Sequence, residues 1–244
     1  MLSIIIPALN EEKYLPLLLN SLKKQNFSDY ELILADAGST DRTLEIAKSY
    51  GCIITPGGLP AKGRNEGAKI AKGDLLFFCD ADVILPDNFF EKSLEEFKKR
   101  CLDVASFCLT PLPQSRITSL FLNVFYNYSS ILMENILPHA AMGIFIKKEI
   151  FEKLKGFDEE IKIAEDHDLA RRAKKFFKAR FGIIKSVNIF VSDRRFKTDG
   201  WLKTGIKFLF CELYMIFIGP VKSDIFKYRF NHYNLYNLKV KPKK

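Results

Sequence analysis

The feature that most limits the possible folds is a series of apolar runs separated by helical patterns. The five runs are Ser3–Ile6, Glu31–Ala35, Cys52–Thr55, Leu75–Cys79 and Val104–Leu109, and the helical patterns between the first four are Tyr14–Lys24, Asp41–Tyr50 and Arg64–Lys72. Strands that are apolar on both faces and alternate with helices form parallel sheets covered by helices on each side. The sequence therefore predicts an α/β fold with a mostly parallel central sheet.

The length of the chain and its less regular second half suggest how the domains are organised. With 244 residues, 48% of them hydrophobic, the chain can bury one large α/β core. The second half predicts helices and strands in the order Ile117–Leu137 (helix), His139–Ile146 (strand), Ala164–Phe177 (helix) and Ile183–Val191 (strand). We expect one domain over residues 1–200 and a C-terminal amphipathic, basic extension over residues 201–244.

The cysteines and the first residues indicate a reducing compartment. The five cysteines are odd in number and show no C-x-x-C pairing, so neither a disulfide framework nor a zinc site is expected. The opening segment, MLSIIIPALNEE, has no basic leader before its apolar run. These features predict a cytoplasmic protein.

Acidic and amide side chains follow three of the predicted strands. The first strand leads into Asn10 and Glu11, the second ends at Asp36, and the fourth, in LLFFCDADVILPD, ends at Asp80 and Asp82. Ligands of open α/β sheets bind outside the carboxyl ends of the strands. We therefore expect these side chains to share one edge of the sheet, although each of them alone is also typical of an ordinary solvated loop.

The pair Asp80 and Asp82 suits a divalent metal ion. Mg²⁺ and Mn²⁺ prefer oxygen ligands and commonly take one or two carboxylates together with phosphate oxygens. Such a cation would also offset the repulsion between the two carboxylates. A second Asp-x-Asp pair, Asp166 and Asp168, opens a predicted helix, where the helix dipole favours acids in any case.

Several segments resemble one enzyme family when they are taken in order. They are SIIIPALNEE, ADAGSTDRT, GRNEGAKIAKGD, FFCDADV, KGFDEE and AEDHDLARRA. In this order the chain resembles the family 2 glycosyltransferases over roughly residues 1–200, with Ala37 where the family often carries a second acid. The resemblance implies a GT-A (Rossmann-like) fold and an inverting enzyme that uses a nucleotide-diphosphate sugar.

The resemblance also implies roles for individual residues in donor binding. Asp36 would accept a hydrogen bond from the nucleotide base, and since uracil and guanine both offer ring N–H groups, the donor would be UDP- or GDP-linked. Asp82, with Asp80, would hold Mn²⁺ or Mg²⁺. The full set of expected donor-site residues, with Lys62, Arg64 and Asn65 on a Gly-flexed loop, is Pro7, Asn10, Glu11, Asp36, Lys62, Arg64, Asn65, Asp80, Ala81, Asp82, Arg194 and Arg195.

Asp166 is the general base that the resemblance implies. It would take a proton from an acceptor hydroxyl, which then attacks the anomeric carbon opposite the leaving group and inverts its configuration. An ionised phosphate acceptor would need no base, so a base favours a hydroxyl acceptor. The acceptor region would include His139, Met142, Gly143 and Glu165, although His139 taken alone is more typical of a packing histidine. Helix capping is the alternative reading of Glu165, Asp166 and Asp168.

The C-terminal extension indicates contact with a membrane surface. Glu212 interrupts the apolar stretch, and uncharged Leu213–Val221 is shorter than the ~20 residues of a spanning helix. Aromatic residues beside lysines suit a helix that lies in the membrane interface, and the basic end Lys239–Lys244 would attract anionic lipid. We expect a peripheral protein on the cytoplasmic membrane face with a glycan or lipid-linked acceptor. Core packing and homodimer formation remain alternatives for this segment.

Other classes of protein explain the sequence less well. The net charge of +9 would suit a nucleic-acid binder, but acids at three strand ends would repel phosphates, so no nucleic-acid partner is expected. A sugar-phosphate nucleotidyltransferase usually has a Gly-rich, Arg-containing loop after the first strand, where this chain has PALNEEKYLP. A catalytically idle scaffold would not need Asp80, Asp82 and Asp166.

Overall fold

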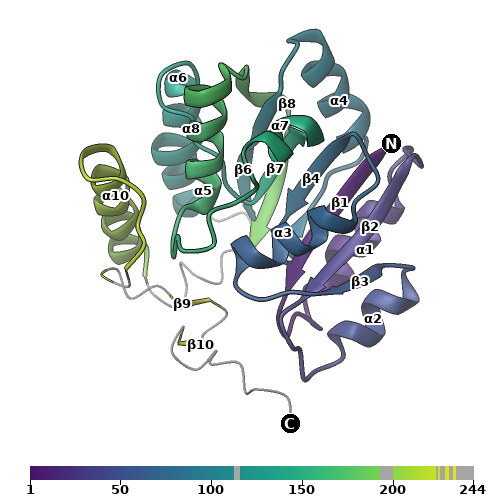
Figure 1. Ribbon diagram of the computed structural model, residues 1–244. Coiled ribbons are helices and arrows are strands. Elements are labelled where there is room, and N and C mark those ends of the chain that lie inside the picture. Colours follow the sequence, from purple (N-terminus) through teal and green to yellow (C-terminus); the bar gives the residue numbers. More distant parts are fainter. Residues whose placement is uncertain (113–115, 193–199, 224, 226–228, 231–232, 235–244) are drawn as a thin grey trace.

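The computed structural model describes residues 1–112, 116–192, 200–223, 225, 229–230 and 233–234 (Figure 1). Arg194, Arg195 and the basic end Lys239–Lys244 lie outside these described residues. The described part forms a central sheet with helices on both faces, and α10 (Trp201–Phe217) stands at one side (Figure 1).

The central sheet is mixed, with a parallel half and a half that changes direction. Its strands are β1 (Leu2–Ala8), β2 (Tyr30–Asp36), β3 (Ile53–Pro56), β4 (Leu75–Cys79), β5 (Val83–Ile84), β6 (Val104–Leu112), β7 (Gly143–Lys147) and β8 (Phe181–Ser192). They pair in the order β3-β2-β1-β4-β7-β6-β8-β5. Strands β3, β2, β1 and β4 run parallel, whereas β7 runs antiparallel to both β4 and β6. The predicted α/β fold is confirmed, and its parallel part is the half that carries the strand-end carboxylates.

Helices cover the two faces of the sheet through separate apolar cores. Helices α1 (Leu15–Lys23), α2 (Thr43–Ser49) and α4 (Phe89–Lys99) pack on one face around buried phenylalanines such as Phe77 and Phe107. Helices α3 (Pro60–Ile70), α7 (Lys148–Lys153) and α8 (Glu165–Phe177) pack on the other face. A short antiparallel pair, β9 (Arg229–Phe230) and β10 (Tyr233–Asn234), lies apart from this sheet.

Two predicted boundaries were wrong for local reasons. The helix predicted from Arg64 begins at Pro60, so Lys62, Arg64 and Asn65 lie on α3 and not on a flexible loop. Proline suits the first turn of a helix because that turn does not need its N–H. The strand predicted from His139 begins only at Gly143, because Met142 adopts the left-handed φ of 62° and turns the chain before β7.

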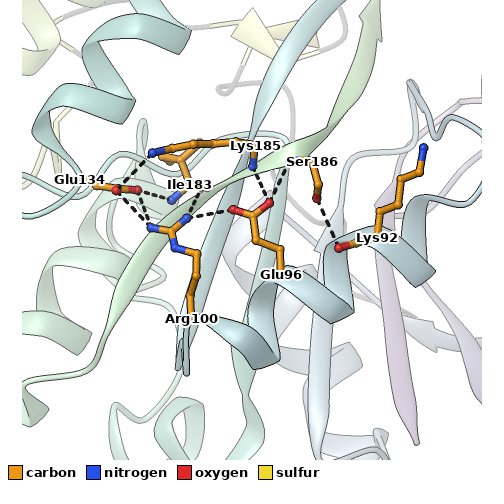
Figure 2. Close-up of polar contacts among 7 residues, drawn as sticks. All are labelled: Lys92, Glu96, Arg100, Glu134, Ile183, Lys185 and Ser186. Atoms are coloured by element: carbon orange, nitrogen blue, oxygen red, sulfur yellow. Dashed lines mark hydrogen bonds and ion pairs between the residues drawn. The ribbon is translucent and has the colours of Figure 1, made fainter.

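A polar network fixes the long helical segment between β6 and β7. This segment comprises α5 (Arg116–Phe121), a π-helical stretch (Leu122–Tyr128) and α6 (Ser129–Met133). Just after α6, Glu134 accepts hydrogen bonds from Arg100 at 3.0 and 3.1 Å and from the backbone N–H of Ile183 at 2.8 Å (Figure 2). Arg100 also donates to Glu96 and to the Ile183 carbonyl oxygen. The network therefore joins the end of α6 to α4 and β8.

Candidate active site

The structure brings the predicted strand-end residues to one edge of the sheet. In the parallel register, Ala8 at the end of β1 pairs with Asp36 at the end of β2, and β4 runs beside β1 in the same direction. Asp80 and Asp82 follow β4 directly. The carboxylates of Asp36, Asp80 and Asp82 thus follow the carboxyl ends of neighbouring parallel strands, as the sequence predicted.

The loop after β1 is tied to the loop after β2. Asn10 has a left-handed φ of 54°, its backbone N–H donates to Ser39 Oγ at 2.9 Å, and its Oδ1 accepts from the Thr40 N–H at 2.8 Å. The N–H of Glu11, which is buried, donates to Thr43 Oγ1 at 2.8 Å. These bonds hold the two loops together beside Asp36 and give the edge a fixed shape.

The two carboxylate oxygens of Asp36 differ in their hydrogen bonding within the described residues. Its Oδ2 accepts hydrogen bonds from the N–H groups of Gly38 and Ser39, each at 3.0 Å. Its Oδ1 is buried and receives no hydrogen bond from any residue that the structure describes. A buried acceptor without a donor is costly, so this oxygen is suited to a donor group on a ligand.

Arg64 forms the centre of a buried charge cluster. Only 4% of its side chain is exposed, and its guanidinium lies 2.8 Å from Asp80 Oδ1, 2.5 Å from Glu165 Oε1 and 3.0 Å from Asp166 Oδ1. It also lies over the ring of Phe157, 5.4 Å from the ring centre. One cation on α3 thus links the end of β4 to the start of α8.

The cluster shifts the pKa values of its members. Burial alone would lower the pKa of Arg64, but the charges of Asp166, Asp80 and Glu165 raise it, so the guanidinium stays charged. The pKa of Asp166 is raised well above its ordinary value, first by burial and then by Glu165 and Asp80, against the opposing effect of Arg64. A carboxylate with a raised pKa, next to a fixed cation, has the properties of a general base.

The other expected donor-site residues hold different positions. Lys62 is exposed on α3, Ala81 is buried, and Asp82 is half-buried. An ideal Cβ on Gly63 would lie 3.2 Å from Pro7 Cβ, so α3 packs closely on the end of β1. Asn65 is engaged by the turn after α7: its amide donates to the Phe157 carbonyl and to Glu159, and its Oδ1 accepts from the Phe157 N–H. A donor contact by Asn65 stays a prediction.

Of the four expected acceptor-region residues, Glu165 and Met142 contact the charge cluster, whereas Gly143 and His139 make other contacts. The Asp80 N–H donates to the Met142 carbonyl at 3.3 Å, and the Met142 backbone bonds to Asp166. An ideal Cβ on Gly143 would lie 2.3 Å from Ile189 Cδ1, so a larger residue there would require the Ile189 side chain to move. His139 lies 3.1 Å from Glu212 on α10. The ion pairs of Arg64 with Glu165 and Asp166 were not predicted. These residues lie about a hundred positions apart in the sequence, and local sequence patterns do not indicate such contacts.

Comparison with known proteins shows which family this sequence resembles. The sequence model of the family described as "Glycosyl transferase family 2" matches residues 3–118. An uncharacterized glycosyltransferase of Haemophilus influenzae is 33% identical over 69% of this chain and 60% of its own length. The uncharacterized glycosyltransferase EpsJ of Bacillus subtilis is 30% identical over 68% of this chain and 54% of its own length. The chain therefore spans between one half and two thirds of these relatives.

Solved structures share the fold at low sequence identity. The mannosyltransferase PcManGT from Pyrobaculum calidifontis, in complex with GDP-Man and Mn²⁺, has a TM-score of 0.65 at 18% identity, covering 78% of this chain and 56% of that one. S. aureus TarS 1-349 in complex with UDP-GlcNAc has a TM-score of 0.62 at 22% identity, covering 87% and 66%. Because its motifs occur in the family's order and its sequence and sheet match these proteins, the chain belongs to glycosyl transferase family 2 and has the GT-A fold.

Proposed function

We propose that the protein is an inverting glycosyltransferase that moves a sugar from a nucleotide-diphosphate donor to an acceptor hydroxyl. The observation that carries this proposal is the single sheet edge at which Asp36, Asp82 and the Arg64 cluster meet. Family membership supports it, as do structural neighbours that were solved with UDP-GlcNAc and with GDP-Man.

The donor nucleotide would bind between the loops after β1 and β2. The buried Asp36 Oδ1 needs a donor, and a ring N–H of uracil or guanine would supply one. Pro7, Asn10 and Glu11 would form the wall of this pocket, and the exposed Lys62 would approach the diphosphate as a cation. Asp80 and Ala81 would face the ribose or the sugar. Arg194 and Arg195, outside the described residues, stay predicted diphosphate ligands.

The donor set at the end of β4 fits a divalent metal. Asp82 would hold Mn²⁺ or Mg²⁺ together with phosphate oxygens, and Asp80, which also contacts Arg64, would be a second partner. A metal bound there would neutralise charge on the leaving nucleoside diphosphate. The Mn²⁺ in the PcManGT structure supports a metal of this kind.

Asp166 would act on the acceptor. Its side chain is 13% exposed, and Arg64 and the Met142 backbone hold it beside the end of β4. Its carboxylate would accept the proton of the acceptor hydroxyl, and the oxygen would attack the anomeric carbon opposite the diphosphate, which inverts the configuration. Met142, Gly143 and Glu165 would shape the acceptor side of this site.

A thermal-shift experiment tests donor binding. We expect UDP or GDP, or one of their sugars, to raise the melting temperature in the presence of Mn²⁺, and Asp82→Ala to remove most of that rise, because the metal links protein to diphosphate. Asp87→Ala is the matched control, since Asp87 is an exposed acid in the same segment. Stabilisation that does not need metal, or that survives in Asp82→Ala, would contradict the proposal. Release of inorganic diphosphate during turnover would instead indicate a nucleotidyltransferase.

Two neighbouring helical segments present exposed apolar side chains that would meet a membrane surface. In α10 they include Leu209, Phe210 and Phe217. In the segment from α5 to the end of α6 they include Phe125 and Leu132, and Ile136 follows in the turn after α6. An ideal Cβ on Gly205 would lie 2.7 Å from the Phe121 ring, so the two segments pack closely together. Within the described residues, none of the helices is both long and apolar enough to cross a bilayer. Peripheral binding at the cytoplasmic face would give access to a lipid-linked acceptor.

Vesicle co-sedimentation tests the membrane surface. We expect binding to vesicles that contain phosphatidylglycerol, and at least about tenfold weaker binding for Phe217→Glu, because burying a phenylalanine contributes ~1.5–3 kcal/mol. Phe217 is 79% exposed, and Phe176→Glu is the matched control because Phe176 is 62% exposed on α8. Equal sedimentation of Phe217→Glu and the unchanged protein would contradict membrane binding. A concentration-dependent dimer that only Phe217→Glu dissociates would assign the surface to a homodimer.

A further inference from the structure

A second cluster of metal-ligating side chains lies where α10 meets α8. It consists of His139, which precedes β7, His167 on α8 and Glu212 on α10. One ring nitrogen from each histidine and one carboxylate oxygen lie within 4.8 Å of one another, and the two rings meet edge to face with centres 5.0 Å apart. None of the donor-site roles proposed above uses His167 or Glu212.

The contacts of His139 place either a proton or a metal ion beside Glu212. The Nδ1 atom of His139 lies 2.8 Å from the Leu137 carbonyl oxygen, which can only accept, so Nδ1 carries the proton. The Nε2 atom lies 3.1 Å from Glu212 Oε1. In a neutral ring this Nε2 would direct a lone pair at a carboxylate lone pair, which is repulsive. Either a second proton or a metal ion must therefore lie between them.

His167 provides the observation that favours the metal. Its Nδ1 is buried and makes no hydrogen bond with any part of the chain that the structure describes. A buried nitrogen without a partner is costly, and a metal–nitrogen bond would satisfy it.

We propose that His139, His167 and Glu212 form a binding site for a divalent transition-metal ion such as Zn²⁺. Two imidazoles and one carboxylate suit Zn²⁺, whereas the oxygen-rich end of β4 suits Mg²⁺ or Mn²⁺. Two ligands bound tetrahedrally at ~2.1 Å lie about 3.4 Å apart. The 3.1 Å between His139 Nε2 and Glu212 Oε1 is close to that separation.

The surroundings of the cluster match those of histidine metal sites. Such histidines usually donate their other ring N–H to a backbone carbonyl, as His139 does to Leu137. Arg171 bonds to Glu212 Oε1 and to the Pro138 carbonyl, so it orients the carboxylate, although its charge opposes a second cation. The fourth coordination position would remain for water or another ligand.

A metal ion bound at this cluster would link α10 to the rest of the domain. Helix α10 already contacts the domain through a small apolar cluster of Ile163, Cys211, Met215 and Val221. A shared ion would add a bond between Glu212 and His167, the residue next to Asp166. The site would thereby couple the position of α10 to the start of α8.

Cobalt binding tests the proposal without any donor or activity assay. Untagged protein comprising residues 1–244 is treated with a chelator, dialysed and titrated with Co²⁺ in the absence of nucleotide while visible absorption is recorded. We expect one equivalent of Co²⁺ to produce the strong visible band of a four- or five-coordinate site, and Zn²⁺ to displace it. His139→Gln, His167→Gln and Glu212→Gln should each weaken Co²⁺ binding at least about tenfold, since even second-shell changes cost ~10–100-fold.

Two controls separate this site from others. His232→Gln removes the third histidine of the chain and Asp82→Ala removes the expected donor metal, and neither should change the band. Failure of the unchanged protein to bind one equivalent of Co²⁺ would overturn the proposal, and this result does not depend on the folding of any variant. A band that survives all three substitutions, or one with thiolate charge transfer from cysteine, would overturn it as well.

Discussion

Asp166→Asn is expected to lower sugar transfer by ~10²–10⁴-fold while donor binding stays as in the unchanged protein. Asparagine keeps the shape of the side chain but cannot accept the acceptor's proton. The donor nucleotide is expected to contact Asp36 and Asp82, which lie on other elements, so its affinity should not change. Initial-rate measurements with saturating donor, combined with calorimetric titration of the nucleoside diphosphate, separate the two quantities.

The control for this substitution lies on the same helical turn. Asp168 is also buried, and its carboxylate accepts from Arg172 at 2.6 Å. If the acids of α8 act only as helix-terminal charges, Asp168→Asn and Asp166→Asn should behave alike. We expect Asp168→Asn to lower stability and retain turnover. Retained turnover in Asp166→Asn would show that Asp166 is not the general base.

The pH profile gives a further signature of the same carboxylate. Burial, Glu165 and Asp80 raise the pKa of Asp166, and a general base works only when it has lost its proton. The rate of the unchanged protein should therefore fall as the pH drops through this raised pKa, above the range of an ordinary aspartate. The residual rate of Asp166→Asn should lack that limb of the profile.

Arg64→Met should cost ~3–5 kcal/mol of unfolding free energy near neutral pH. The guanidinium is 4% exposed and is the cation that Asp80, Glu165 and Asp166 share. Without it, three carboxylates would stand close together with reduced access to water. Urea denaturation monitored by circular dichroism measures the loss. Lys62→Met removes a positive charge from an exposed position on the same helix and should cost far less.

The sign of the pH dependence distinguishes charge from packing in this variant. A carboxyl group whose pKa in the folded state is raised above its unfolded value destabilises the protein when it is ionised. As the pH falls through the raised pKa, the group binds a proton and the penalty disappears. The stability gap between Arg64→Met and the unchanged protein should therefore narrow towards acid pH. A gap that is constant with pH would assign the loss to packing alone.

Local patterns predicted the parallel half of the fold but not the rest of the sheet. The runs around Ile5, Ile33 and Phe77 are apolar on both faces, so burial on two sides could be inferred from composition. The insertion of β7 between β4 and β6, in antiparallel direction, depends on contacts between segments far apart in the chain. The periodicity of apolar residues carries no information about the position or the direction of β7 in the sheet.

The candidate site likewise has one part that the sequence predicted and one part that it did not predict. Asp36, Asp80 and Asp82 were predicted because one rule about strand ends places them together. The partners of Arg64 and Glu212 could not be predicted, since several acids and bases of the chain would satisfy the same charge. Pro60 is a local signal for the start of α3. A prediction that began the helix at Pro60 would have placed Lys62, Arg64 and Asn65 on it.

The most direct test of the central claim is anomalous diffraction from crystals soaked with Mn²⁺ and UDP or GDP. We expect an anomalous peak beside the Asp82 carboxylate, in contact with the diphosphate, and a ring N–H of the base within hydrogen-bonding distance of Asp36 Oδ1. A nucleotide bound elsewhere, or a diphosphate with no manganese at Asp82, would contradict the account.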